Sequence, residues 1–244
     1  MRDVIPAETF TQRELHISKY HRRSGGETPE KNGEAGYVIQ RKGYQPRIAR
    51  GQPNHRTRCD RTCDMIGGRV HRRAWCAAAS GRKQYGGRQR WIDVGAPGSN
   101  ESFVRGALLQ NKAAAARFTG LKAAGDVFSA AGAVNERLDA LPFPIDVAVI
   151  GMGADGHTAS WFPYAEGLGA ALDPAGAAKA AAVRAARSAV TGDFLDRMTL
   201  TLKVIAGARL AVLMITGAGK REAFKAALAG GDEMEMPVRA LLRA

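Results

Sequence analysis

Two short runs of hydrophobic residues stand out along the second part of the chain. They cover residues 145–150 and 210–215, and each is followed by a turn that contains glycine. Short apolar runs bounded by turn residues are typical of parallel strands that are covered on both faces. Residues 199–202 alternate between threonine and leucine, which predicts another strand.

Helical patterns lie between these strands. Ser99 or Asn100 can cap a helix whose apolar side chains fall on roughly one face over residues 103–108. Alanine-rich segments that favour helix continue to about Leu141, and residues 220–228 predict a helix after the last apolar run. Strands that alternate with helices predict the α/β class. We expect an open, mostly parallel, Rossmann-like sheet with helices on both faces, incomplete on its N-terminal side.

Residues 1–88 lack this order. Val, Ile, Leu and Phe supply 10 of these 88 residues, against 38 of the 156 residues in 89–244. Apolar positions recur with the period of neither a strand nor a helix, apart from isolated candidates such as residues 37–39. We predict loop or disorder over residues 1–88. A folded α/β domain is predicted only over residues 89–244, where the apolar content suffices for a core.

The formal net charge of +13 is concentrated in the same first part of the chain. Residues 1–88 hold 19 of the 36 basic residues and 8 of the 23 acidic ones, so the remainder is close to neutral. A basic chain suggests nucleic acid as a partner. A charge confined to one third of the chain argues against nucleic acid as the partner of residues 89–244.

The sequence shows no sign of a membrane or of an oxidising compartment. No window of about 18 apolar residues could span a bilayer, and no apolar run follows the N-terminus as a secretory signal requires. Three cysteines cannot form a disulfide framework. We therefore expect a cytoplasmic protein that does not contact a membrane, and the sequence indicates no oligomeric state.

The stretch from Gly151 to Ser160 reads G-M-G-A-D-G-H-T-A-S and follows the first apolar run directly. The carboxyl end of a buried strand is where open α/β sheets hold their ligands. The three glycines Gly151, Gly153 and Gly156 allow a tight turn and let a ligand approach backbone amides. Thr158 or Ser160 could cap a following helix, whose N-terminus would attract an anion.

Asp155 and His157 are the residues of this stretch that can carry proton chemistry. They lie two positions apart, so the carboxylate can orient the imidazole, whose reference pKa of about 6.5 suits a general base. A glycine turn that happens to contain a partly buried histidine is the plain structural alternative. The spacing of the glycines does not fit a dinucleotide-binding fingerprint, so no nucleotide cofactor is expected.

Residues 146–163, which read D-V-A-V-I-G-M-G-A-D-G-H-T-A-S-W-F-P, resemble the signature of the 6-phosphogluconolactonases. That family shares a superfamily with the glucosamine-6-phosphate deaminases. The resemblance extends from Gln89 to the end of the chain. Three further segments are similar to the family pattern: Arg90-Trp91 followed by residues 99–101, residues 197–202 (R-M-T-L-T-L), and Thr216-Gly217 with Lys220.

The resemblance implies an α/β enzyme that hydrolyses 6-phosphoglucono-δ-lactone to 6-phosphogluconate. A lactone is an ester, so the reaction needs an activated water and stabilisation of an oxyanion. His157 would take the proton from water while Asp155 holds its ring. The backbone amides of residues 151–156, or the side chain of Arg90, would stabilise the oxyanion.

The resemblance also implies residues that bind the substrate. Lys220 would bind the phosphate at the start of a helix, Arg197 would bind the phosphate or the sugar carboxylate, and Asn100 would contact a hydroxyl. The plain alternatives are solvated basic side chains for Arg90, Arg197 and Lys220, and a helix cap for Asn100. No metal is implied, because residues 89–244 contain one histidine and no cysteine.

Residues 1–88 depart from the family pattern. The family begins with a strand and a phosphate-binding loop of the form S-G-G-S-T-P. Residues 24–29 (S-G-G-E-T-P) match that loop only superficially, because basic residues rather than an apolar strand precede them. Arg88-Gln89 stand where the family has an acidic pair. We interpret residues 1–88 as an out-of-frame or replaced segment, which would deprive the chain of part of the phosphate site.

Three other functions fit parts of the sequence. A sugar-phosphate deaminase or isomerase shares G-x-D-G-H, but the continuation at residues 158–163 favours the lactonase. A catalytically silent member of the superfamily would sense sugar phosphates without turnover. A zinc site beside nucleic-acid-binding arginines could form in the first part, although the Cys-x₃-Cys spacing is looser than that of zinc fingers. Its candidate ligands are His55, Cys59, Cys63, His71 and Cys76.

Overall fold

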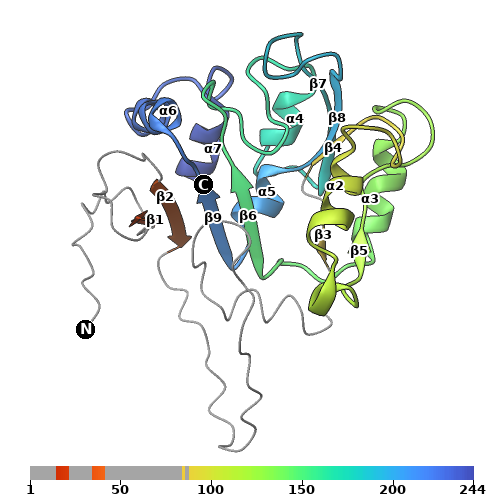
Figure 1. Ribbon diagram of the computed structural model, residues 1–244. Coiled ribbons are helices and arrows are strands. Elements are labelled where there is room, and N and C mark those ends of the chain that lie inside the picture. Colours follow the sequence, from red (N-terminus) through yellow and green to blue (C-terminus); the bar gives the residue numbers. More distant parts are fainter. Residues whose placement is uncertain (1–14, 22–34, 42–83, 86–87) are drawn as a thin grey trace, which may run out of the picture.

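The computed structural model describes residues 15–21, 35–41, 84–85 and 88–244. Figure 1 shows the arrangement of their helices and strands. The strands are β1 (Leu15–His21), β2 (Ala35–Arg41), β3 (Gln84–Tyr85), β4 (Arg88–Arg90), β5 (Phe118–Thr119), β6 (Val147–Gly151), β7 (Ala180–Arg184), β8 (Asp196–Leu200) and β9 (Leu210–Met214). The helices are α2 (Asn100–Ala107), the 3₁₀ helix η1 (Asn111–Ala113), α3 (Ala131–Asp139), α4 (Leu168–Leu172), α5 (Leu202–Ala206), α6 (Ala218–Leu228) and α7 (Val238–Arg243).

The described strands form a mixed α/β fold with three sheets rather than one. The largest has the order β1-β2-β9-β6, with β6 and β9 parallel from Val147↔Leu210 to Gly151↔Met214. A second sheet has the order β4-β8-β7 and is antiparallel throughout. β3 and β5 form a short parallel pair. Among the described residues, four of the six strand pairings are antiparallel, so the expected single, mostly parallel sheet differs from what these residues form.

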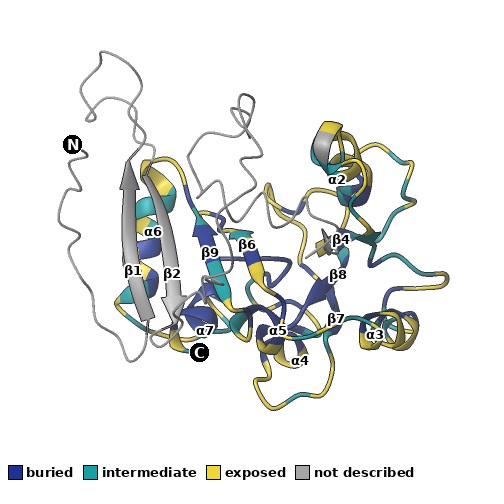
Figure 2. Cartoon of the chain, turned by 90° about the horizontal axis from the view of Figure 1, so that it is seen from below, coloured by how far each residue is buried: buried dark blue, intermediate teal, exposed yellow. Residues whose placement is uncertain are grey.

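β6 does not have two covered faces, as its apolar run predicts. Ala148 is buried in the core, whereas Val147 and Val149 are 36% and 53% exposed. In the described part of the chain β6 pairs only with β9 and lies at the edge of its sheet (Figure 2 shows the exposed positions along it). An apolar run predicts a strand, but its second face is covered only where another element packs against it.

The first part of the chain contains strands where loop or disorder is predicted. β1 and β2 pair antiparallel over seven residues, and Ile39 of β2 pairs with Ala211 of β9. The isolated apolar residues 37–39 lie within β2. Pairing of backbone groups between strands does not need a strong apolar period, which explains why loop or disorder was predicted for these segments. The S-G-G-E-T-P segment at residues 24–29 and the cysteine and histidine cluster at residues 55–76 lie outside the described residues.

The helices follow the sequence pattern at some positions and not at others. Ser99 caps α2 as predicted, because its side chain accepts a hydrogen bond from the Ser102 amide. α6 begins slightly before the predicted start at residue 220. Residues 114–130 are rich in alanine, yet they form turns and the short β5. Alanine favours helix only weakly, and tertiary context overrides that preference here.

The core consists of two neighbouring clusters that share Ile150 of β6. The larger cluster surrounds Trp161 and Leu168, which are fully buried. The smaller one joins β9 to α6 and α7 through residues that include Leu213 and Phe224. No helix in the described ranges is long and apolar enough to cross a membrane.

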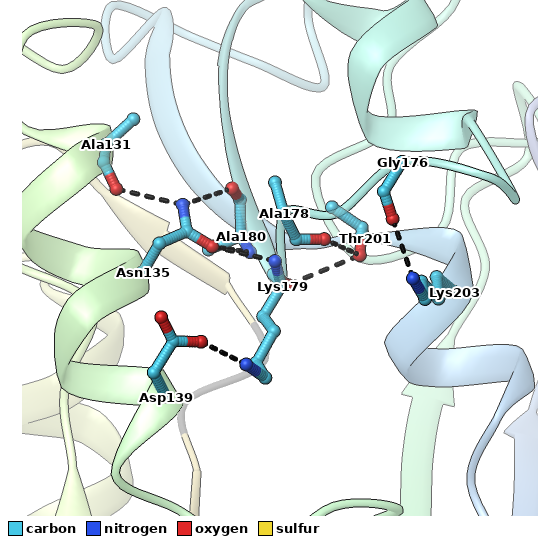
Figure 3. A network of polar contacts seen from close by, with 9 residues as sticks. All are labelled: Ala131, Asn135, Asp139, Gly176, Ala178, Lys179, Ala180, Thr201 and Lys203. Carbon is cyan, nitrogen blue, oxygen red and sulfur yellow. Dashed lines mark hydrogen bonds and ion pairs between the residues drawn. The ribbon is translucent and has the colours of Figure 1, made fainter.

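Polar contacts fasten α3 to the antiparallel sheet (Figure 3). The Asn135 amide nitrogen donates to the carbonyl oxygens of Ala131 and Ala180, both at 2.9 Å. Its oxygen accepts from the amides of Lys179 at 2.7 Å and Ala180 at 3.0 Å. The ammonium of Lys179 also pairs with the carboxylate of Asp139. Because the Asn135 amide uses both donors and accepts twice, it fixes the start of β7 against the helix.

Candidate active site

The loop that follows β6 is folded tightly around His157. The Gly153 amide donates to the His157 carbonyl oxygen at 2.9 Å, and the Gly156 amide donates to the Gly153 carbonyl oxygen at 3.2 Å. Gly156 has a φ of +79°, a region that favours glycine. A Cβ atom at Gly153 would lie 2.2 Å from Nδ1 of His157 and 2.3 Å from Oδ1 of Asp155. Glycine at position 153 therefore leaves the room in which these two side chains meet.

Asp155 holds the imidazole of His157. Its Oδ1 lies 2.6 Å from Nδ1 of the ring and also accepts a hydrogen bond from the His157 amide at 3.2 Å. Burial raises the pKa of the Asp155 carboxyl, but the hydrogen bonds and the charge of His157 outweigh it and lower that pKa overall. An ionised Asp155 favours the tautomer with the proton on Nδ1. The lone pair of Nε2 is then available to accept a proton.

Phe162 connects the histidine to the opposite wall of the pocket. Its ring stacks on the ring of His157 with a centroid separation of 4.6 Å. The guanidinium carbon of Arg197 lies 5.6 Å from the centroid of the same Phe162 ring. The imidazole of His157 and the guanidinium group of Arg197 thus both lie against the ring of Phe162.

The opposite wall is built by two paired strands. Arg88 and Arg90 are two positions apart on β4, so their side chains leave the same face of the sheet. Arg90 pairs with Arg197 on the neighbouring β8. Gln89, between the two arginines, points the other way and is buried. The period of two along β4 and the register with β8 therefore bring three guanidinium groups to one wall.

These three arginines have no carboxylate partner among the described residues. Arg197, which is only 4% exposed, donates to the carbonyl oxygens of Thr191 and Asp196. Arg90 donates to the carbonyl oxygen of Gly98 at 2.7 Å. Burial, together with the charges of Arg90 and Arg88, outweighs the opposing charge of Asp196 and lowers the pKa of Arg197 to about 10. Positive charges that crowd one another favour the binding of an anion.

The structure brings together some of the predicted site residues. His157, Arg90, Asn100 and Arg197 all line one pocket. Asn100 contributes its Oδ1 to the site framework by accepting a hydrogen bond from the Arg90 amide at 3.0 Å. The pocket also contains residues that the sequence did not single out as site residues: Arg88, Ser160, Phe162 and Val190. Arg88 could have been found from its spacing, because it lies two positions before Arg90 in a short strand and so shares its face.

Other predicted site residues lie apart from the pocket lining. Thr158 is buried and donates its hydroxyl to the Gly151 carbonyl oxygen at 2.7 Å, so it fastens the loop. The predicted helix cap at Thr158 or Ser160 is wrong, because the next helix, α4, begins at Leu168. The turn after Thr158 is instead closed by backbone contacts. The glycines of the loop shape the backbone behind His157 rather than line the pocket.

Lys220 lies in the first turn of α6, which directly follows β9. The register of β9 with β6 places Met214 beside Gly151. The carboxyl ends of these two parallel strands therefore lie at the same edge of the sheet, from which the His157 loop also starts. Lys220 does not line the pocket that contains His157. Within the described ranges, no group of three or more His, Cys, Asp or Glu side chains could hold a metal ion.

The comparisons with known proteins address this same part of the chain. A family model described as Glucosamine-6-phosphate isomerases/6-phosphogluconolactonase matches residues 83–244. The chain belongs to this family. The resemblance drawn from the sequence motifs is confirmed at the level of the family.

Individual relatives carry the name of the lactonase branch. The chain is 43% identical over 157 residues to the 6-phosphogluconolactonase of Pseudomonas aeruginosa, an alignment that covers 64% of each protein. It is also 43% identical over 157 residues to the 6-phosphogluconolactonase of Mesorhizobium japonicum, with 64% of this chain and 63% of the relative covered. A crystal structure of a 6-phosphogluconolactonase from Shewanella baltica matches with a TM-score of 0.59 and 36% identity over 65% of each chain. The chain thus spans less than two thirds of the length of these relatives.

Proposed function

We propose that this chain hydrolyses 6-phospho-D-glucono-1,5-lactone to 6-phospho-D-gluconate, a step of the oxidative branch of the pentose phosphate pathway. The observation that carries the proposal is the Asp155–His157 pair, whose imidazole lines one pocket with three arginines that form no salt bridge with a carboxylate of the described residues. The names of the relatives in the same family support the choice of substrate. The proposed partner is therefore a small phosphosugar lactone, and no cofactor enters the reaction.

The proposed reaction begins with a water molecule beside Nε2 of His157. The imidazole takes a proton from the water as its oxygen attacks the lactone carbonyl carbon, and Asp155 stabilises the imidazolium that forms. The carbonyl oxygen becomes an oxyanion, which the nearby guanidinium groups of Arg90 and Arg197 stabilise. The tetrahedral intermediate then collapses and the bond to the ring oxygen breaks. The imidazolium returns its proton to that ring oxygen, which becomes a hydroxyl.

Binding roles are proposed for the remaining residues. Lys220 would receive the phosphate, because it lies in the first turn of α6 at the sheet edge from which the His157 loop starts. Asn100 would contact a sugar hydroxyl from the pocket wall. Gly151, Gly153 and Gly156 shape the loop that carries the base. We assign these roles to residues 89–244 as the lactonase-like domain, to whose pocket Arg88, the last residue of the basic segment, is added.

An isomerase or deaminase acting on an amino sugar phosphate is the second candidate, because the family description names glucosamine-6-phosphate isomerases together with 6-phosphogluconolactonase. The lactonase is favoured by the residues that follow His157: Phe162 stacks on this histidine and contacts Arg197, and it belongs to the T-A-S-W-F-P continuation typical of the lactonases. A sugar-phosphate sensor without turnover would not need the held tautomer of His157.

The proposal is tested with the purified chain and with His157→Ala. The wild-type protein is expected to hydrolyse the lactone faster than its spontaneous hydrolysis, followed by proton release at constant pH. Loss of the general base is expected to lower kcat about 10²–10⁴-fold. Binding of 6-phosphogluconate should persist, because the arginines remain. A wild-type rate equal to spontaneous hydrolysis would refute the proposal, and conversion of glucosamine 6-phosphate would select the isomerase.

A further inference from the structure

The hydroxyl of Ser160 is buried in the pocket wall and has no hydrogen-bond partner in the part of the chain that the structure describes. Ser160 is 1% exposed, and its Oγ makes no hydrogen bond with any described residue. It lines the same pocket as His157 and the three arginines. A buried hydroxyl without a partner costs free energy, and natural proteins rarely leave one. Such a group inside a pocket indicates that a bound molecule supplies the missing partner.

Contacts of its neighbours hold the backbone around Ser160 in place. The Ser160 amide donates to Oγ1 of Thr199 at 3.2 Å. The next residue, Trp161, donates from its indole nitrogen to the Leu200 carbonyl oxygen at 2.9 Å. The preceding residue, Ala159, has a φ of +50°, which is strained for a residue with a Cβ atom. Strain of this kind persists at functional sites where the surrounding contacts enforce it.

The chemistry of the wall selects the kind of partner. Guanidinium groups only donate hydrogen bonds, so Arg88, Arg90 and Arg197 cannot accept the Ser160 proton. An anionic oxygen of a ligand can accept from the hydroxyl and from the guanidinium groups at the same time. A hydrogen bond to such a charged oxygen is stronger than one between neutral groups.

We propose that Ser160 is a substrate-contact residue, whose hydroxyl donates a hydrogen bond to an anionic oxygen of the phosphosugar held by the arginine wall. The anionic oxygen belongs either to the phosphate or to the group at the reacting carbonyl, and the hydroxyl suits both. The identity of the sugar rests on the proposed function, whereas the contact with an anion does not.

The decisive variant is Ser160→Ala, compared with Thr201→Val as a matched control. Thr201 also has a buried hydroxyl, but that hydroxyl donates to the Ala178 carbonyl oxygen at 3.0 Å, and Thr201 does not line the pocket. Ser160→Ala should leave the melting temperature of the ligand-free protein unchanged or higher, because no hydrogen bond is lost. It should weaken binding of 6-phosphogluconate about 10-fold. Thr201→Val should lower the melting temperature and leave the affinity unchanged.

Calorimetric titration with two smaller anions locates the contact. A loss of affinity for inorganic phosphate would place the oxygen at the phosphate, and a loss for gluconate would place it at the carbonyl end; either supports the proposal. Unchanged affinity for 6-phosphogluconate would overturn it. So would a melting temperature that falls as in Thr201→Val.

The titrations do not depend on turnover. An inactive wild-type chain whose affinity for anions depends on Ser160 would refute the proposed function and keep this inference. An active wild-type chain whose affinity for anions is unchanged by Ser160→Ala would keep the proposed function and refute this inference.

Discussion

The two walls of the pocket differ in how their charged side chains are paired. The loop wall carries Asp155 and His157, and the strand wall carries Arg88, Arg90 and Arg197. On the loop wall, the one anionic side chain, Asp155, lies 2.6 Å from Nδ1 of His157, so the charge has a partner within the protein. On the strand wall, the guanidinium groups of Arg88, Arg90 and Arg197 lie close enough to lower the pKa of Arg197, and no carboxylate of the described residues pairs with them. The charge of the loop wall is paired within the protein, whereas the guanidinium groups of the strand wall form no salt bridge with a carboxylate of the described residues.

From this difference we infer a separate role for each wall. A paired carboxylate fixes the tautomer and orientation of an imidazole, which is what a proton acceptor needs. An unpaired group of guanidinium ions is stabilised when an anion arrives, which is what a binding surface needs. Breaking the loop wall should therefore impair kcat and leave affinity unchanged. Breaking the strand wall should impair affinity and also the stabilisation of the oxyanion.

Gly153→Ala is expected to have the largest effect and to act on the loop wall alone. The added Cβ would collide with Nδ1 of His157 and Oδ1 of Asp155. Displacing the base by about 1 Å can lower kcat about 10²-fold. Gly169→Ala is the control, because its Cβ would meet nothing within 4 Å and Gly169 lies exposed in α4. Steady-state kinetics of both variants check this, and equal kcat values would contradict the tight packing of the pair.

Arg197→Met tests the strand wall, with a smaller expected effect. Loss of a charged donor should weaken binding of 6-phosphogluconate by about 10-fold or more. Arg184→Met is the matched control from the same sheet, since Arg184 is exposed and its Nε pairs with Oδ1 of Asp196 at 2.6 Å. Titration calorimetry should show a loss only in the first variant. Wild-type affinity should also decline as the pH rises through about 10, where Arg197 loses its proton.

The smallest expected effect is the change in thermal stability caused by Asp155→Asn, and this change should depend on pH. The pKa of Asp155 is lower in the folded protein than in the unfolded chain. Its carboxylate therefore stabilises the fold above the unfolded value of about 3.9, and this contribution disappears as the pH falls through the lower folded value. The variant should melt a few degrees below the wild type at pH 7, and this difference should shrink as the pH falls below about 4. A difference that grows toward acid pH would contradict the assigned sign.

The loop wall could be predicted from the sequence and the strand wall only in part. Asp155 and His157 are two positions apart, so their contact follows from local geometry. The arginine wall depends on the pairing of Arg90 with Arg197, which are 107 positions apart in the chain. Arg90 and Arg197 were found through their motifs, but Arg88 was noticed only as a departure from the family pattern. Its place in the pocket follows from the alternation along β4.

The same distinction applies to the fold. The apolar runs that became β6 and β9 were visible in the sequence, and so was the cap of α2. Which faces are covered depends on the neighbours in space, and this is why Val149 of β6 is exposed against expectation. β1 and β2 depend on pairing with each other rather than on an apolar period. The antiparallel sheet could not be inferred from the threonine and leucine alternation of 199–202.

The arginine wall also has a consequence for the rate of encounter. Its positive charges attract an anion before any contact forms, and the attraction extends over about 8 Å at physiological ionic strength. Capture of an anionic substrate should therefore speed up as salt is removed, while proton transfer at His157 proceeds at the same pace. As the ionic strength rises, the step that limits the rate at low substrate concentration would then change from proton transfer to the diffusional capture of the substrate.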